Sequence, residues 1–273
     1  MREYKIVFGD LDGTMLNSHS KVSDENCLAI EALHRKGVAF VPSTGRSLSE
    51  VPDEIYRNPF IRYYICSNGA YVLDKQTGHC HLTCMSNQTV QSIVAILRRF
   101  EAHLTLRCGG GCHVDANYVS KEAFDYYNVI EAHRVVVNAF SICHEEFEAF
   151  CESAEQVEVI SVFFRNHGDL LASRKAIEEL GSLRVVSVGE NNLEIMNADA
   201  GKGNALLWLA KHLGVNREET VSVGDSDNDS NIIAAAGLGL AVSNACQSLK
   251  DIADEIVCSN DEHVLQEIVN RYF

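Results

Sequence analysis

The chain has 273 residues, of which 46% are hydrophobic and 22% charged; this is the composition of a folded globular protein with room for two domains, and it excludes a disordered chain. Its 23 basic and 38 acidic residues give a net charge of −15, which argues against binding to the phosphate backbone of nucleic acids. No run approaches the roughly 18 apolar residues of a membrane span, and the first residues lack the apolar stretch of a signal peptide, so we expect a soluble, cytoplasmic protein.

The first part of the chain alternates apolar runs with helical patterns. The runs at 5–10, 38–45 and 63–69 are apolar almost throughout, which indicates parallel strands that are buried on both faces. Between the first two runs, Ser23 can cap a helix that Gly37 ends. Strands that alternate with helices in this way predict a Rossmann-like α/β sheet.

The middle of the chain has a different pattern. About 110 residues, enough for a small α+β domain of its own, separate the last of these strands from the next comparable one. Helical patterns in this part cover 87–101, 145–155 and 170–180, and strand-like runs cover 104–108, 113–119, 157–164, 184–188 and 193–197.

The strand and helix pattern of the first part resumes near Lys202. Helices are expected over 202–213 and 228–236, and strands over 220–225 and 238–244. We therefore predict that residues 1–82 and 195–273 form one α/β core, and that residues 83–194 form a domain inserted into it.

Polar side chains follow the strands of the predicted core. Thr44 and Asn68 each follow an apolar run, and ligands of an open parallel sheet bind at the carboxyl ends of its strands. Four carboxylates are expected at the same edge, from Asp10, Asp12, Asp225 and Asp229. Such a cluster is destabilising unless a cation compensates it, and oxygen ligands with room for water and phosphate favour Mg²⁺.

Two basic residues are candidates for holding a phosphoryl group at this edge. Lys202 and Arg46 supply positive charge in a protein whose overall field repels anions. Thr44 offers a hydroxyl and Gly45 an unobstructed backbone N–H, and both suit a phosphate oxygen.

Five motifs together resemble those of a known family. They are DLDGT (10–14), STGR (43–46), SNGA (67–70), the GKG around Lys202, and GDSDND (224–229). In this order they are similar to the motifs of the haloacid dehalogenase (HAD) superfamily, and the long middle segment resembles the cap of its Cof-type (IIB) branch. The resemblance spans nearly the whole chain. It implies an α/β protein whose Rossmann-like parallel sheet core has the HAD fold, with an inserted α+β cap domain of the C2B type.

The resemblance also implies a reaction, the Mg²⁺-dependent hydrolysis of small phosphomonoesters such as sugar phosphates through an aspartyl-phosphate. Asp10 matches the family's nucleophile, and Asp12 its general acid and base. The implied metal ligands are Asp10, the main-chain carbonyl of Asp12, and Asp225, with Ser226 and Asp229 in support directly or through water. The implied phosphate contacts are the backbone N–H of Leu11, Thr44, Gly45, Lys202 and Asn228, and Arg46 and Asn68 are further candidates for substrate binding.

Other interpretations stay open at this stage. Arg46 can instead form a structural salt bridge, and Asn68 can simply shape its turn. A phosphosugar mutase of the same superfamily, and a non-catalytic module that binds Mg²⁺ and phosphate, are the alternative functions. The sequence does not indicate an oligomeric state. In the cap, the residues proposed for substrate specificity are Arg107, His113, Asp115 and Arg165.

A few positions depart from the family pattern. Gly9 replaces a bulkier residue before the nucleophile, and Pro42 and Ser43 are unusual before TGR. Near the end of the chain, SNDE (259–262) is not followed by the glycine common in this branch, and it has no assigned role.

The cysteine and histidine clusters do not predict a zinc site. The ten cysteines form no CxxC pair, and in HCHLTC (79–84) and CGGGCH (108–113) the cysteines are four residues apart. We expect the cysteines to be reduced, small hydrophobic residues of the interior. The glycines at 109–111 are expected in a hairpin or loop of the cap.

Overall fold

The chain divides into two compact units. The computed structural model describes residues 3–187 and 190–273. One unit, here called the core unit, comprises residues 1–45, 51–81 and 201–273, and the other, the inserted unit, comprises residues 46–50 and 82–200. This division differs from the expected domain boundaries at residues 46–50, 82 and 195–200, all of which the sequence placed in the core.

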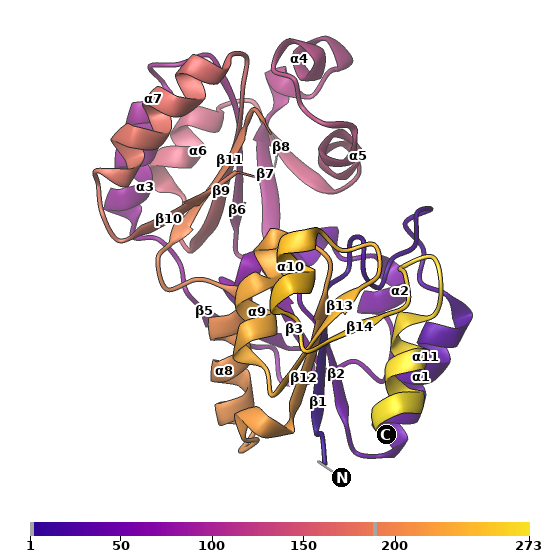
Figure 1. The fold of residues 1–273 in the computed structure, drawn as a ribbon. Coiled ribbons are helices and arrows are strands. Elements are labelled where there is room, and N and C mark those ends of the chain that lie inside the picture. Colours follow the sequence, from indigo (N-terminus) through magenta and orange to yellow (C-terminus); the bar gives the residue numbers. More distant parts are fainter. Residues whose placement is uncertain (1–2, 188–189) are drawn as a thin grey trace. The chain divides into compact units, whose positions relative to one another are not determined.

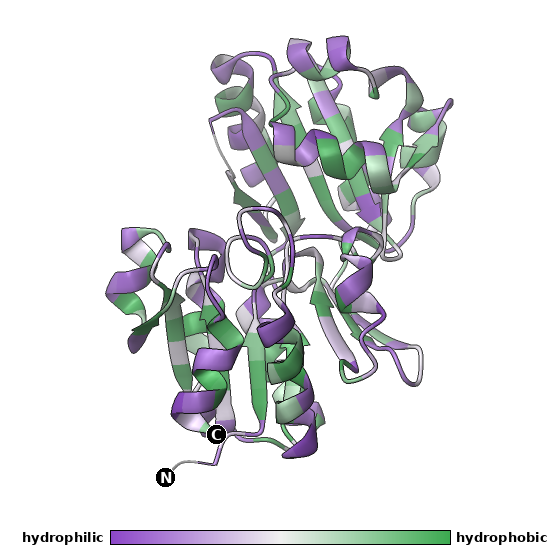
Figure 2. Ribbon diagram, turned by 90° about the vertical axis from the view of Figure 1, so that its right-hand side faces the viewer, coloured by the Kyte–Doolittle hydropathy of each residue, from purple (hydrophilic) through white to green (hydrophobic). Residues whose placement is uncertain are grey.

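A parallel sheet of five strands forms the centre of the core unit, in the order β14-β13-β12-β1-β2. The pairs β1–β12, β1–β2, β12–β13 and β13–β14 are all parallel, with Val7 opposite both Val221 and Phe40. Figure 2 shows this sheet as mainly hydrophobic. The predicted α/β fold is therefore confirmed. The strands are β1 (Ile6–Gly9), β2 (Ala39–Pro42), β12 (Thr220–Gly224), β13 (Leu238–Val242) and β14 (Glu255–Val257).

Helices cover both faces of this sheet (Figure 1). α1 (Asp24–Arg35) and α11 (Val264–Tyr272) lie on one face, and α8 (Lys202–His212) and α9 (Ser230–Ala235) on the other. Ser23 caps α1 as predicted, because its side chain accepts a hydrogen bond from the backbone N–H of Asn26. The remaining short helices of the core unit are α2 (Asp53–Tyr56), α10 (Gln247–Ile252) and the 3₁₀ turns η4 (Arg217–Glu219) and η5 (Asp227–Asp229).

A smaller sheet of three strands contains β3 (Tyr63–Cys66), β4 (Tyr71–Asp74) and β5 (His79–Leu82). β3 runs beside β2, since Ser43 and Ile65 form a parallel bridge. The run predicted over 63–69 is thus a strand that ends at Cys66, followed by the turn η2 (Ser67–Gly69).

The inserted unit is built on a sheet of six strands in the order β10-β11-β9-β6-β7-β8. All of its pairs are antiparallel except β7–β8, which is parallel. The predicted middle strands are present, except that the run expected over 113–119 is a strand only to Asp115 and continues as the turn η3 (Ala116–Tyr118). Val188, at the end of the run 184–188, lies outside the described residues. The strands are β6 (Ala102–Cys108), β7 (Gly111–Asp115), β8 (Ser141–His144), β9 (Val157–Phe164), β10 (Leu183–Val186) and β11 (Asn192–Asn197).

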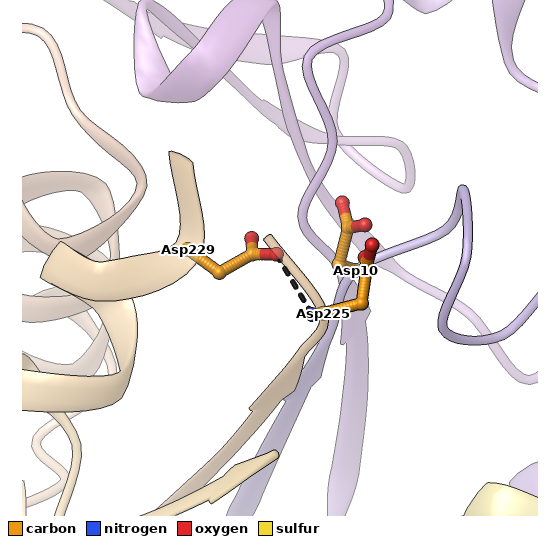
Figure 3. Close-up of side chains that lie close together, drawn as sticks. All are labelled: Asp10, Asp225 and Asp229. Atoms are coloured by element: carbon orange, nitrogen blue, oxygen red, sulfur yellow. Dashed lines mark hydrogen bonds between the residues drawn. The ribbon is translucent and has the colours of Figure 1, made fainter. Parts of the chain in front are cut away.

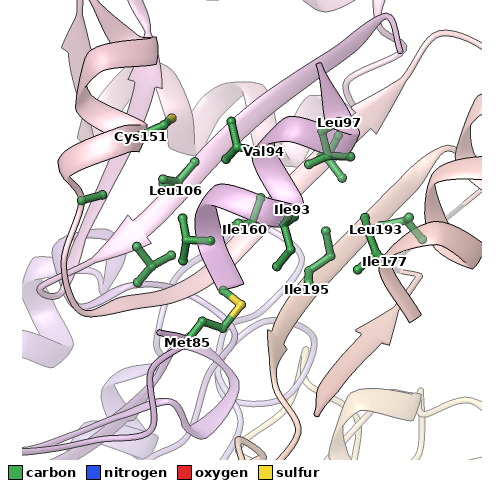
Figure 4. Close-up of a cluster of buried hydrophobic side chains, with 14 of the residues drawn as sticks. Met85, Ile93, Val94, Leu97, Leu106, Cys151, Ile160, Ile177, Leu193 and Ile195 are labelled. Carbon is green, nitrogen blue, oxygen red and sulfur yellow. The ribbon is translucent and has the colours of Figure 1, made fainter. Parts of the chain in front are cut away.

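The inserted unit has its own hydrophobic core, which lies between this sheet and the helices α3 (Asn87–Leu97), α6 (Phe147–Ser153) and α7 (His167–Glu178). Ile93, Ile160 and Ile195 are fully buried there (Figure 4). The opposite face carries α4 (Lys121–Tyr126) and α5 (Glu131–Phe140), which the sequence did not predict. The turns η1 (Leu48–Glu50) and η3 (Ala116–Tyr118) complete this unit.

Two unusual sequence features have local explanations. A Cβ atom at Gly9 would lie 2.9 Å from the ring of Phe40, so a bulkier residue does not fit there. Gly109 and Gly110 have φ of +57° and +79° and form the turn of the β6–β7 hairpin, as the hairpin interpretation predicted.

The cysteines are all free. Cys66, Cys108, Cys112 and Cys151 are buried, whereas Cys143 is exposed, so the expectation of buried cysteines holds for only part of the set. Within the described ranges, the model contains no helix of the length and apolar character that crossing a membrane requires.

Candidate active site

Asp10 and Asp225 lie side by side because the two strands that precede them are neighbours. Asp10 follows β1 and Asp225 follows β12, and the last paired residues of these strands are Gly9 and Val223. Asp229, at the end of the turn η5, approaches from the side of β12 (Figure 3). One carboxylate oxygen of each of the three residues lies within 4.8 Å of the others. Three of the four carboxylates expected to converge are therefore close together, whereas the side chain of Asp12 is exposed and is not part of this group.

Lys202 joins two of these carboxylates. Its Nζ donates to Oδ1 of Asp10 at 2.6 Å and to Oδ1 of Asp229 at 2.6 Å. Lys202 is the first residue of α8, and its side chain is only 1% exposed. Lys202 is therefore not a solvated lysine at the start of a helix.

The cluster carries more negative than positive charge. Three carboxylates and one ammonium leave a formal charge of −2. Burial, and after it the charge of Asp229, raise the pKa of Asp10 well above its usual value. The same two causes raise the pKa of Asp225. Burial alone would lower the pKa of Lys202, but Asp10 and Asp229 outweigh it and keep the ammonium protonated.

This excess of charge fits a divalent cation. Buried carboxylates need a counter-charge, and a set of oxygen donors matches a hard ion such as Mg²⁺. Asp10, Asp225 and Asp229 are the group of described residues whose side chains can hold a metal ion.

The contacts of Asp229 differ from those of the other two carboxylates. Its Oδ2 accepts the backbone N–H groups of Asp225 and Ser226 at 3.1 and 3.3 Å, while its Oδ1 accepts from Lys202. Asp229 is fully buried, and a Cβ atom on Gly224 would lie 2.6 Å from it. Both oxygens of Asp229 are thus engaged by the chain itself.

The loop after Asp10 closes against Asp225. Thr14 donates its hydroxyl to Oδ1 of Asp225 at 3.0 Å. Gly13 has φ of +75°, and a Cβ atom there would lie only 2.7 Å from Oδ2 of Asp225. The sequence analysis gave Thr14 no role, although it belongs to the DLDGT motif. The glycine and the threonine of this motif both serve to bring the loop against Asp225.

Thr44, Gly45 and Asn68 form a second group at the same edge of the sheet. The backbone N–H of Asn68 donates to the carbonyl of Thr44 at 3.1 Å, and a Cβ atom on Gly45 would lie 3.0 Å from Oδ1 of Asn68. Asn68 has a left-handed backbone with φ of 52°, so it does shape its turn. A Cβ atom on Gly69 would lie 2.3 Å from the carbonyl oxygen of Gly201, which brings this turn directly against the start of α8.

The other candidate residues are placed differently. Asp12 is exposed and Leu11 is fully buried. Ser226 donates its hydroxyl to Oδ1 of Asn228 at 2.7 Å, next to Asp229 in the chain. Arg46 belongs to the inserted unit, where its guanidinium donates to the carbonyl of Glu50 at 2.9 Å.

The residues suggested for specificity have structural partners in the inserted unit. Arg107 is buried between Glu50 and Glu194, at 3.2 and 3.1 Å. Arg165 is exposed and pairs with Glu101 at 3.4 Å. His113 forms a hydrogen bond with His144, with 2.8 Å between Nδ1 and Nε2. Asp115 accepts the backbone N–H of Asn117 at 2.8 Å.

Comparison with known proteins gives consistent results. The family model of the haloacid dehalogenase-like hydrolases matches residues 7–269. Phosphatase YwpJ of Bacillus subtilis is 31% identical over 95% of this chain and 96% of its own length. A putative phosphatase of Haemophilus influenzae is 25% identical over 99% of this chain and 98% of its own length.

Solved structures of this fold cover the chain almost completely. A haloacid dehalogenase-like hydrolase from B. subtilis matches with a TM-score of 0.83 and 30% identity, over 98% of this chain and all of that one. The subclass IIB sugar phosphatase BT4131 matches with a TM-score of 0.81 over 98% of both chains, at 19% identity. This second likeness concerns the fold alone.

Proposed function

The chain belongs to the haloacid dehalogenase-like hydrolases and is a phosphoric monoester hydrolase, and we propose that it hydrolyses small phosphomonoesters, such as sugar phosphates, with Mg²⁺ and a covalent intermediate on Asp10. The observation that carries this proposal is the buried cluster of three carboxylates with a single ammonium, located where β1 and β12 end. A cluster with excess negative charge suits a divalent cation and a phosphoryl group better than any neutral ligand.

Asp10 is proposed as the nucleophile because it is nearly buried and its orientation is fixed. Lys202 holds Oδ1 at 2.6 Å, which leaves Oδ2 for attack on phosphorus. In the first step an Asp10 oxygen forms a bond to phosphorus while the bond from phosphorus to the ester oxygen breaks. Asp12 donates its proton to that departing oxygen and so releases an alcohol.

The second step returns the enzyme to its starting state. Water attacks the phosphorus of the aspartyl-phosphate and transfers a proton to the Asp12 carboxylate. The bond between Asp10 and phosphorus breaks, which releases inorganic phosphate and restores both aspartates. In this scheme Asp12, whose side chain is exposed, acts first as an acid and then as a base.

The remaining candidates are assigned to binding. Asp10, Asp225 and the main-chain carbonyl of Asp12 would hold Mg²⁺, with Ser226 in support, and the ion would supply positive charge for the phosphate oxygens. We assign to Asp229 the orientation of Lys202, because both of its oxygens are engaged. The proposed phosphate and substrate contacts are the backbone N–H of Leu11, Thr44, Gly45, Arg46, Asn68, Lys202 and Asn228.

The test is hydrolysis of p-nitrophenyl phosphate by the purified protein. We expect turnover with Mg²⁺, none with EDTA, and none in Asp10→Asn. Asp227→Asn is the matched control, since it changes an exposed aspartate of the GDSDND motif outside the cluster. Quenching during turnover and reduction with borohydride should convert Asp10 to homoserine, detectable in the peptide mass. Undiminished activity in Asp10→Asn would falsify the assignment of the nucleophile.

The same preparation separates the alternatives. A mutase would interconvert hexose phosphates without release of inorganic phosphate, and a binding module would turn over none of a broad panel of phosphomonoesters. Release of phosphate from members of that panel, with sugar phosphates among the best, is the expected result.

A further inference from the structure

The SNDE segment (259–262), which the sequence analysis left without a role, contacts the loop after the proposed nucleophile. It follows β14, about 250 residues from that loop along the chain. The side-chain amide of Asn260 donates to the carbonyl of Leu16 at 3.0 Å. Next to it, a carboxylate oxygen of Asp261 accepts the backbone N–H of Ser18 at 2.7 Å.

A second asparagine joins this contact. Asn244, just after β13, donates its amide N–H to the carbonyl of Gly13 at 2.8 Å, and its Oδ1 accepts the backbone N–H of Asn260 at 2.9 Å. Each end of the Asn244 amide therefore has a definite role. A carboxylate at position 244 could still accept the backbone N–H of Asn260 but could not donate to the carbonyl of Gly13. The hydrogen bond to Gly13 therefore requires an amide side chain. We call Asn244 and Asn260 the asparagine brace.

The brace adds contacts to a loop that also contacts Asp225. Gly13 lies against Asp225, and Thr14 donates to it. Asn244 holds the carbonyl of Gly13 itself. Leu16, which Asn260 holds, also forms a bridge with Asp12. The peptide units that follow Asp12 are thus held by two separate sets of contacts, although the Asp12 side chain is exposed.

We infer that Asn244 and Asn260 are positioning residues for the general acid Asp12. By fixing the carbonyls of Gly13 and Leu16, they hold the backbone of residues 12–16, so that the Asp12 carboxyl reaches the departing oxygen. The inference rests on the proposed function, in which Asp12 protonates the leaving group. Displacement of a catalytic group by about 1 Å can reduce a rate by roughly a hundredfold.

Leaving-group dependence distinguishes this role from general structural support. A general acid matters most when the departing oxygen is basic, and little when it leaves readily as p-nitrophenolate. The quantity to measure is kcat/KM, which reports phosphoryl transfer to Asp10, for aryl phosphates from p-nitrophenyl to phenyl phosphate. For Asn244→Ala and Asn260→Ala we expect a loss of about 10- to 100-fold with phenyl phosphate and under about threefold with p-nitrophenyl phosphate.

Three variants complete the experiment. Asp12→Asn gives the dependence of kcat/KM on the leaving group when the general acid is absent. The dependence measured for Asn244→Ala and Asn260→Ala should shift toward that of Asp12→Asn. Asn244→Asp keeps the size of the side chain but loses the donor to Gly13, so it should behave as Asn244→Ala does. Asn270→Ala, on α11, removes an exposed amide whose Oδ1 accepts from Gln266, and it should match the wild type for every substrate.

The outcomes separate the inference from the function on which it rests. Equal losses across the series, or no loss, would overturn the positioning role while leaving the phosphatase intact. If the wild type hydrolyses no aryl phosphate, the proposed function fails, and the brace loses its role with it.

Discussion

The charge balance at the cluster predicts that Asp10→Asn stabilises the metal-free protein while it abolishes activity. The formal charge of the cluster is −2 without a metal ion, and the pKa of Asp10 is raised because burial and the charge of Asp229 disfavour its ionised form. An asparagine has the same shape, and its oxygen can still accept from Lys202. Relief of such a destabilised functional site is typically worth about 0.5–2 kcal/mol. For a unit of about 150 residues this corresponds to an increase in Tm of roughly 1–8 °C.

Lys202→Met is the opposite perturbation and should have the opposite sign. It removes the positive charge of the cluster and leaves the buried carboxylates of Asp10 and Asp229 without a counter-charge, which costs about 3–5 kcal/mol. The assay is thermal unfolding of the wild type and both variants in EDTA and in increasing Mg²⁺. In Mg²⁺ the wild type should gain up to about 2.7 kcal/mol at a hundredfold excess over Kd. Asp10→Asn, which lacks one proposed ligand, should gain less. If Asp10→Asn were destabilised in EDTA as strongly as Lys202→Met, Asp10 would be a net stabilising partner of Lys202, and the reasoning from excess charge would be wrong.

Three further perturbations test separate parts of the structure. Gly13→Ala should lose about 1–2 kcal/mol from its left-handed backbone, and because its methyl group would lie 2.7 Å from an oxygen of Asp225, the Mg²⁺ concentration for half-maximal activity should rise. Burial lowers the pKa of His103 from 6.5 to about 4, so its contribution to stability is complete above pH 6.5 and is lost as the pH falls toward 4. By pH 5 that loss is about 2 kcal/mol. Denaturation curves recorded above pH 6.5 and at pH 5 should show this loss in the wild type but not in His103→Phe. Arg107→Met removes the counter-charge of the buried Glu50 and the partly buried Glu194 and should cost about 3–5 kcal/mol. Arg57→Met, at an exposed site, should leave the Tm unchanged.

The parallel sheet could be predicted from the sequence because its signal is local. Strands such as β1 and β13 are buried on both faces, and nearly every residue in them is apolar. The helix α5 lacked such a signal. Its run of β-branched residues disfavours a helix locally, and its stability depends on packing in the inserted unit, where Val137 is buried while Val135 is 57% exposed.

Only part of the candidate site could be predicted from the sequence. The rule that parallel strands end at one edge was enough to bring Asp10 close to Asp225. It could not show that Lys202 reaches Asp229 as well as Asp10, since that depends on where the long side chain of the first residue of α8 extends. The asparagine brace was missed for a similar reason. Every residue has a backbone carbonyl, so the residue type at position 13 does not indicate that Asn244 donates to it.

Arg46 shows why a continuous motif need not be one structural element. The STGR motif reads as a single phosphate-binding segment, yet its arginine belongs to the inserted unit together with residues 47–50. That segment is held there by Arg107, which pairs with Glu50, and by the backbone N–H of Ser49, which donates to the carbonyl of Gly110. Arg46 in turn donates to the carbonyl of Glu50. The segment that carries Arg46 is therefore anchored to β6 and to the β6–β7 turn.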